Sequence, residues 1–209
     1  MISNESPQLT YIYTFVHTDG LVFPEEEKER VRDSIVQVIQ AGCRLIDTAK
    51  VYGTEGLVGS AIQESGVPRS EITVVTKLPD SCHDDPQASF DEALERLGTG
   101  YIDIYLMHWP TATATQGDGR TRRQLRIHES PTFIETYKKM EALVGPRCKS
   151  IGVSNFTQRT LDTLLEHATI VPVVNQVELH PLNPNLKLVP YCQERNIQVM
   201  AWGYYPSIH

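Results

Sequence analysis

Leu45-Ile46-Asp47-Thr48-Ala49-Lys50-Val51-Tyr52-Gly53-Thr54-Glu55 is the stretch that decides the fold, because a short apolar strand runs directly into polar residues. Two later segments repeat this design, Val74-Val75-Thr76-Lys77 and Ile104-Tyr105-Leu106-Met107-His108-Trp109-Pro110. Asp47, Lys77 and His108 therefore fall at the ends of successive predicted strands, and Tyr52 follows the first of them. A parallel β/α barrel gathers its catalytic groups at the carboxyl ends of its strands, so these segments indicate an active site of that kind.

The remaining chain continues the alternation of short apolar runs with amphipathic segments. Strands are expected at Arg44–Thr48, Ile72–Lys77, Ile102–His108, Lys149–Val153, Val171–Val177 and Ile197–Trp202. Helices are expected from Pro24 to Gly42 and at Thr54–Glu64, Asp85–Leu97, Thr132–Val144, Thr157–His167 and Leu186–Arg195. This alternation is typical of a parallel sheet with helical crossovers. It predicts an α/β fold of the (β/α)8 TIM-barrel type, incomplete at about six βα units, with residues 1–209 as a single domain.

Composition limits the partners and the compartment. The 209 residues carry a formal net charge of −7, which argues against nucleic acid or an anionic membrane as the main partner. The four cysteines form no CxxC pair and are expected to be free thiols in a reducing cytosol. No secretory signal and no membrane-spanning run is evident, so a cytoplasmic protein is expected.

Tyr52 needs neighbours to act as a proton donor at neutral pH, because the ordinary pKa of a phenol is about 10. A nearby ammonium lowers that pKa, and a carboxylate bonded to the ammonium fixes its position. Lys77 and Asp47 supply those two groups, and the imidazole of His108 can orient a carbonyl or share the proton. Each of these residues taken singly is more commonly an ordinary surface or core residue, so their shared position at strand ends carries the prediction.

Five motifs in order make the chain resemble the aldo-keto reductase family over about residues 25 to 203. The first is Gly42-x-Arg44-Leu45-Ile46-Asp47-Thr48-Ala49-x-x-Tyr52-Gly53-x-Glu55. The others are Thr76-Lys77-Leu78, Leu106-Met107-His108-Trp109-Pro110, Ser150-Ile151-Gly152-Val153-Ser154-Asn155-Phe156 and Asn175-Gln176-Val177-Glu178-Leu179-His180-Pro181.

The resemblance implies a catalytic tetrad of Asp47, Tyr52, Lys77 and His108. Tyr52 would protonate the carbonyl oxygen of a small-molecule aldehyde or ketone while NADPH, or else NADH, delivers hydride. The remaining implied site residues are Ser154, Asn155 and Gln176 on the nicotinamide carboxamide, Trp202 stacked on its ring, and Trp109 with His108 at the substrate. A plain core tryptophan is the other interpretation of Trp109, and no residues are assigned to a metal.

The chain departs from the family after Trp202, where members continue for further βα units that hold the adenosine phosphate. A truncated barrel of this kind predicts weak or absent dinucleotide binding. It also predicts unpaired edge strands, which invite pairing with another chain. We therefore expect a homodimer through the open barrel edge, or a closure that uses the Leu9–Val16 segment.

Two other questions stay open at this stage. The polar segment Thr111–Pro131 is expected to be a loop over the mouth of the site, with a disordered insertion as the alternative. The alternative function is a non-redox acid/base enzyme, an isomerase, dehydratase or cyclase of secondary metabolism, because the four tetrad residues need no hydride donor for such chemistry. A non-catalytic binding protein is the third hypothesis.

Overall fold

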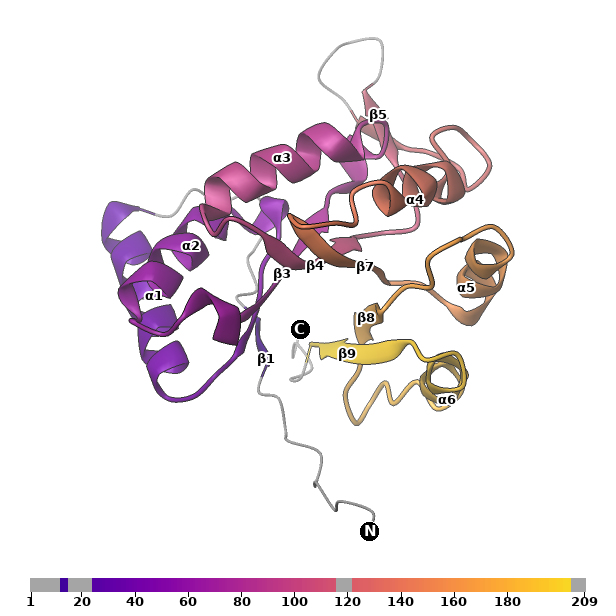
Figure 1. Cartoon of the computed structure of the whole chain (residues 1–209). Helices are drawn as coiled ribbons and strands as arrows, with labels where there is room; N and C mark the ends of the chain where they lie inside the picture. The colour runs from indigo at the N-terminus through magenta and orange to yellow at the C-terminus, as the bar shows by residue number, and fades with distance from the viewer. Residues whose placement is uncertain (1–11, 15–23, 116–121, 204–209) are drawn as a thin grey trace.

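A curled parallel sheet organises the protein, and the computed structural model describes it for residues 12–14, 24–115 and 122–203 (Figure 1). Its seven strands lie in the order β1-β2-β3-β4-β7-β8-β9, and every pairing between them is parallel. The strands are β1 (Ile12–Thr14), β2 (Leu45–Asp47), β3 (Thr73–Leu78), β4 (Ile102–Met107), β7 (Cys148–Ser154), β8 (Val174–Glu178) and β9 (Gln198–Trp202). The predicted incomplete TIM-barrel fold is thus confirmed.

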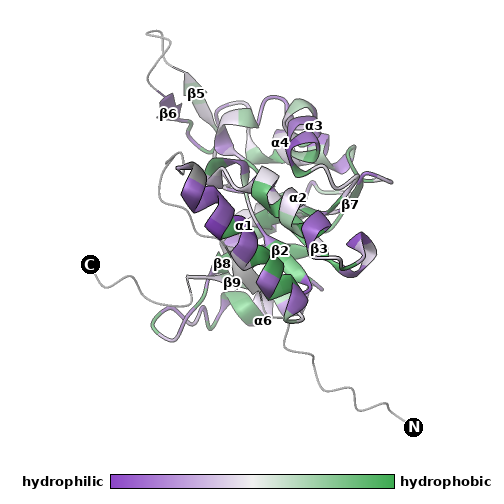
Figure 2. Ribbon diagram, turned by 90° about the vertical axis from the view of Figure 1, so that its left-hand side faces the viewer, coloured by the Kyte–Doolittle hydropathy of each residue, from purple (hydrophilic) through white to green (hydrophobic). Residues whose placement is uncertain are grey.

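Helices cover the outer side of this sheet (Figure 1). They are α1 (Glu25–Gln40), α2 (Glu55–Glu64), α3 (Pro86–Leu97), α4 (Phe133–Glu141), α5 (Gln158–Leu165) and α6 (Leu188–Gln193). Short 3₁₀ turns are η1 (Lys50–Tyr52), η2 (Arg69–Glu71) and η3 (Asp80–Cys82). The ribbon of α1 in Figure 2 alternates hydrophilic and hydrophobic residues, as expected for a helix with one buried side.

Local signals set several of the helix boundaries. The Asp85 side chain accepts from the backbone N–H of Ala88 at 3.0 Å, which caps the start of α3, and Gly98 ends that helix with φ +61°. Thr132 and Glu135 form a capping box at the start of α4. This helix ends at Glu141 rather than at the predicted Val144, because Leu143 and Val144 donate to carbonyls three residues back and tighten the chain into turns.

The predicted start of β8 at Val171 is three residues too early. Val171 and Val173 are exposed, and the described pairing with β9 begins at Val174. An apolar run of β-branched residues therefore predicts strand character without deciding where the ladder begins.

Apolar side chains form one layer on each side of the sheet. The larger cluster packs between the sheet and the helices, and a smaller one lies inside the curl. Val74 belongs to the outer cluster and Val75 to the inner one, as the alternation of side chains along a strand requires. The inner layer contains Leu45, Val75, Leu106, Val174 and Met200.

The edges of the sheet are β1 and β9. The predicted N-terminal closing segment is described only at Ile12–Thr14, where it pairs with β2; its other residues lie outside the described ranges. Among the described strands no pairing joins β1 to β9, so the described sheet is open.

The predicted loop Thr111–Pro131 contains an antiparallel hairpin of β5 (Thr113–Thr115) and β6 (Arg122–Gln124). It follows β4 at the carboxyl end of the sheet, and β5 lies close to η3. Residues 116–121 are outside the described ranges. The described part of this segment is therefore a hairpin at the carboxyl end of the sheet, the end at which the loop was predicted.

Candidate functional site

The inward positions at the carboxyl ends of the strands carry the candidate site. Each lies two residues beyond an inward-facing apolar residue, so strand alternation points it toward the inside of the curl. Gly152 belongs to the same layer, because a Cβ there would meet Leu106 Cδ2 at 2.7 Å. The polar residues at this level are Asp47, Lys77, His108, Ser154, Gln176 and Trp202.

A fully buried ion pair forms the centre of the first half of the site. Lys77 Nζ lies 2.8 Å from both Oδ1 and Oδ2 of Asp47, and both side chains are 0% exposed. The third ammonium proton is directed to the carbonyl oxygen of Thr48, also at 2.8 Å. With its three donors used, the ammonium is held in one position.

Tyr52 lies above this pair on the single turn η1, between β2 and α2. Lys77 Nζ is 4.9 Å from the centroid of the tyrosine ring, and the ring of His108 meets it edge-on at a centroid distance of 5.9 Å. The pKa of Tyr52 is nevertheless raised, because burial outweighs the opposing effect of Lys77. The ammonium of Lys77 thus lowers the pKa of Tyr52 as predicted, but this effect is smaller than the rise in pKa that burial causes.

His108 extends the ladder of β4 by donating its backbone N–H to Leu78 O at 3.1 Å. Burial, aided by the charge of Lys77, lowers its pKa to about 3, so the imidazole is neutral at physiological pH. Trp109 stacks on His108 at a centroid distance of 6.3 Å and is 45% exposed. The interpretation of Trp109 as a core residue is therefore wrong.

The second half of the site is a set of amides and hydroxyls. Ser154 Oγ donates to the carbonyl oxygen of Gln176 at 2.9 Å, and the backbone N–H of Asn155 donates to the same oxygen at 2.8 Å. Asn155 adopts φ +63°, a left-handed conformation that asparagine tolerates. Its Nδ2 donates to His108 O at 2.9 Å, which joins the two halves of the site.

Trp202 and Gln176 differ in whether their side-chain donors have hydrogen-bond partners. The indole N–H of Trp202 donates to Asn155 Oδ1 at 3.1 Å, a contact that the sequence did not predict. Gln176 Nε2 is buried and has no hydrogen-bond partner among the described residues. Such an orphaned donor is costly unless a ligand accepts from it, and a nicotinamide carboxamide oxygen has that capacity. The donor set therefore fits the implied cofactor.

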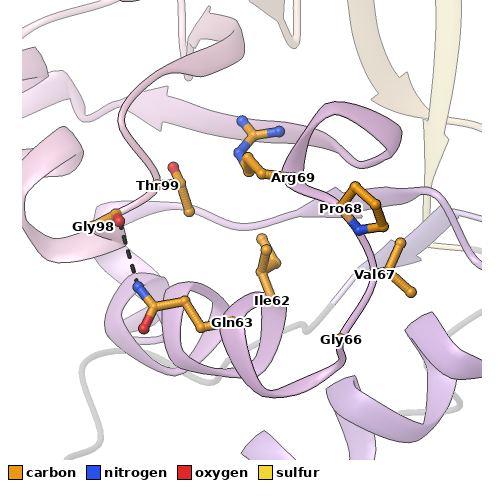
Figure 3. A pocket seen from close by; sticks show the side chains of 8 residues that line it. All are labelled: Ile62, Gln63, Gly66, Val67, Pro68, Arg69, Gly98 and Thr99. Atoms are coloured by element: carbon orange, nitrogen blue, oxygen red, sulfur yellow. Dashed lines mark hydrogen bonds between the residues drawn. The ribbon is translucent and has the colours of Figure 1, made fainter.

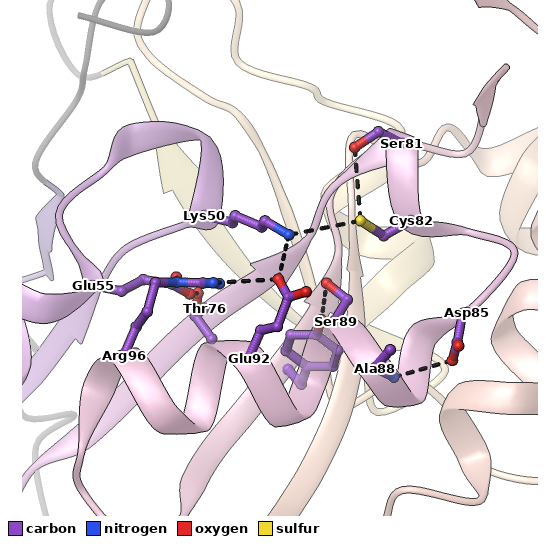
Figure 4. Close-up of polar contacts among 11 residues, drawn as sticks. Lys50, Glu55, Thr76, Ser81, Cys82, Asp85, Ala88, Ser89, Glu92 and Arg96 are labelled. Atoms are coloured by element: carbon purple, nitrogen blue, oxygen red, sulfur yellow. Dashed lines mark hydrogen bonds and ion pairs between the residues drawn. The ribbon is translucent and has the colours of Figure 1, made fainter. Parts of the chain in front are cut away.

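A second polar network, absent from the predictions, lies behind η1 (Figure 4). Glu55 is 2% exposed, accepting from Thr76 Oγ1 at 2.6 Å and from Arg96 Nε at 2.6 Å. Lys50 Nζ donates to Glu92 Oε2 at 2.6 Å. The signals available in the sequence were the unassigned Glu55 of the first motif and the four-residue spacing of Glu92 and Arg96.

A pocket of about 340 Å³ lies at the other end of the sheet, between α2 and α3 (Figure 3). It is bordered by residues that precede β3 and β4, so it is on the amino side of the strands. Its arginine, Arg69, is already paired with Asp103 at 2.7 Å. We therefore place the candidate site at the carboxyl end.

Within residues 12–14, 24–115 and 122–203, no group of three or more His, Cys, Asp or Glu is arranged to hold a metal. In those same ranges, none of the helices has the length and apolar character needed to cross a bilayer. The four cysteines are free thiols.

Comparison with known proteins gives one family. A model described as the aldo/keto reductase family matches residues 19–205. The chain is 38% identical over 187 residues to the aldehyde reductase YPR1 of Saccharomyces cerevisiae, covering 83% of this chain and 60% of the relative. It is 37% identical to the glycerol 2-dehydrogenase (NADP(+)) of the same yeast, covering 88% of this chain and 63% of that protein.

Solved structures agree. The Bombyx mori aldo-keto reductase AKR2E4, in complex with NADP, matches with a TM-score of 0.78 and 35% identity, covering 92% of this chain and 62% of that one. The aldo-keto reductase AKR2E5, complexed with NADPH, matches with a TM-score of 0.78 and 30% identity, covering 91% of this chain and 57% of that one. The chain thus spans about three fifths of the length of these relatives.

Proposed function

Because the chain belongs to the aldo/keto reductase family, we propose that it reduces a small-molecule aldehyde or ketone with NAD(P)H, with Tyr52 as the proton donor. The observation that carries this proposal is the buried Lys77–Asp47 pair beneath Tyr52, with a neutral His108 beside the ring. This arrangement supplies a proton donor, a fixed positive charge and an uncharged hydrogen-bonding group within one site.

The four residues have separate roles in the proposal. Tyr52 gives its phenolic proton to the carbonyl oxygen, and the Lys77 ammonium stabilises the phenolate that remains. Asp47 fixes the ammonium in place. His108 orients the carbonyl by a hydrogen bond and, because burial keeps it neutral, is not the proton donor. Trp109, exposed beside His108, forms a wall of the substrate site.

Ser154, Asn155 and Gln176 are proposed to hold the carboxamide of the cofactor, and Trp202 to lie against its ring. When bound, the reduced nicotinamide supplies the hydride that the carbonyl carbon accepts. The unpartnered Gln176 Nε2 supports this assignment. We propose NADPH rather than NADH, because the two similar structures described above were solved with NADP and NADPH.

The proposal extends to the organisation of the chain. Residues 1–209 would belong to one barrel domain, and the protein would be cytoplasmic. Both edge strands carry backbone groups unpaired in the described sheet, so a homodimer through the open edge is proposed as well. Sedimentation equilibrium measures the mass of the protein in solution, and the mass of a monomer at micromolar concentration would reject the proposed dimer.

The test is a titration of the 209-residue protein with NADPH, followed by the fluorescence of Trp109 and Trp202, the only two tryptophans in the chain. We expect saturable quenching that weakens in Gln176→Ala, and carbonyl-dependent oxidation of NADPH that is lost in Tyr52→Phe. Turnover of a substrate without any nicotinamide would favour the non-redox acid/base alternative. Equal activity of Tyr52→Phe and the unaltered protein in every assay would favour a non-catalytic role.

A further inference from the structure

We infer that Lys50 and Glu92 are positioning residues for Tyr52, holding its turn against α3 through a chain of alternating charges. The inference deepens the proposed function, since it rests on Tyr52 as the proton donor. It concerns a network that lies outside the tetrad and the cofactor residues (Figure 4).

Tyr52 occupies a short turn with little structure of its own. The turn is held by two backbone bonds, Tyr52 N to Ala49 O at 3.0 Å and Gly53 N to Lys50 O at 3.1 Å. A single 3₁₀ turn of this kind has weak intrinsic stability. The position of the phenol therefore depends on side chains that fasten the turn to its surroundings.

The upstream fastening is Lys50, two residues before Tyr52. Its ammonium donates to Glu92 Oε2 on α3 at 2.6 Å and lies 3.9 Å from Cys82 Sγ on η3. The pKa of Glu92 is lowered, chiefly by the hydrogen bond from Lys50. The start of the turn is thus linked to both elements that follow β3.

The downstream fastening is Glu55, three residues after Tyr52. One carboxylate oxygen accepts from Thr76, the residue before Lys77 on β3, and the other from Arg96 on α3. Arg96 Nη1 also reaches Glu92 Oε2 at 3.4 Å, the same oxygen that Lys50 uses. Lys50, Glu92, Arg96 and Glu55 therefore form one continuous series from each side of Tyr52 to the same helix.

The two ends of this series differ in what their loss should do. Glu55 is buried, so removing its partner would leave a buried charge and damage folding. The Lys50 and Glu92 side chains are 32% and 54% exposed, and a pair of that kind adds little to stability. An effect of Lys50 on catalysis without an effect on stability would therefore identify positioning.

The experiment compares Lys50→Met with Arg147→Met. Arg147 forms a similar ion pair with the same helix, to Asp91 at 2.8 Å, and none of its contacts among the described residues is with the Tyr52 turn. We expect kcat for carbonyl reduction to fall about tenfold in Lys50→Met, because small misplacements of a reacting group are costly. In Lys50→Met, KM and the melting temperature should stay near the values of the unaltered protein. Lys50→Arg should keep the kcat of the unaltered protein. Arg147→Met should change none of the three quantities.

A second readout does not depend on turnover. In protein labelled with ¹³C at the tyrosine ζ carbon, Tyr52→Phe assigns the Tyr52 resonance. We expect that resonance to shift or broaden in Lys50→Met and in Glu92→Gln but not in Arg147→Met. Identical resonances and identical kcat in Lys50→Met and Arg147→Met would overturn the inference. An inactive unaltered protein whose Tyr52 resonance still responds to Lys50→Met would reject the proposed reduction and leave the positioning intact.

Discussion

The two halves of the candidate site treat buried polar groups in opposite ways. Between β2 and β4, all three protons of the Lys77 ammonium have acceptors, namely the two carboxylate oxygens of Asp47 and the carbonyl oxygen of Thr48. Between β7 and β9, Gln176 Nε2 is buried without a partner among the described residues. The comparison indicates that the Lys77–Asp47 half is hydrogen-bonded within the protein, whereas the amide half retains one buried donor without a partner among the described residues, as the proposed contact with a cofactor carboxamide requires.

The largest expected effect comes from breaking the preformed half. Lys77→Met leaves the Asp47 carboxylate buried without its partner, which should destabilise folding by about 3–5 kcal/mol. Carbonyl reduction should be lost as well, because no charge remains to stabilise the phenolate. Denaturant unfolding measures the first effect, and NADPH oxidation the second.

The double variant Lys77→Met/Asp47→Leu is the control for that prediction. Removing both charges should restore most of the stability but none of the activity. Recovery of turnover in the double variant would contradict the role assigned to the pair.

An effect of comparable size is expected from pH, and it involves His108 in the first half of the site together with His83, which directly follows η3. Burial lowers the pKa of His83 to about 4 and that of His108 to about 3, both from an ordinary value of 6.5. The unfolded chain then binds more protons below pH 6.5, so stability is full above that pH and falls toward pH 4. The expected loss is about 1.4 kcal/mol per pH unit for each histidine.

His83→Leu separates the two contributions. His83 is buried, and neither ring nitrogen has a partner among the described residues. The variant should roughly halve the loss of unfolding free energy between pH 6.5 and 5, measured by urea denaturation. An unchanged slope would show that His83 is hydrated or protonated in the folded protein.

The smallest effect should come from the ligand-dependent half. Gln176→Met replaces the orphaned amide with an apolar side chain of similar length, so stability should hold or rise by about 1 kcal/mol. NADPH binding should weaken about tenfold, which is the loss of roughly one hydrogen bond. A stability loss comparable to that of Lys77→Met would erase the difference between the two halves.

Part of this site was readable from the sequence for a definite reason. Strand ends and the turn after β2 are marked by local patterns, so the positions of Asp47, Tyr52, Lys77 and His108 could be predicted. The alternation of side chains along each strand could also have predicted which site residues point inward, since each of them lies two positions after a residue of the inner layer. The end of α4 and the start of β8 were predicted less well, because a run of apolar residues does not indicate where a helix tightens into turns or which of its residues will be exposed.

The sequence by itself determined the alternation of the six expected strands with helices, the parallel barrel type and the residues placed at the carboxyl end of the sheet, since these follow from periodicity and short motifs; β1 and the β5–β6 hairpin were not among the expected strands. Only the tertiary structure decided the direction of the Tyr52 pKa, the exposure of Trp109, the hydrogen bond from Trp202 to Asn155 and the unpartnered amide of Gln176. Each of these properties depends on contacts between residues that are far apart in the chain. The Lys50–Glu92 pair shows the same limit, because its residues are 42 positions apart and meet only when η1 packs on α3.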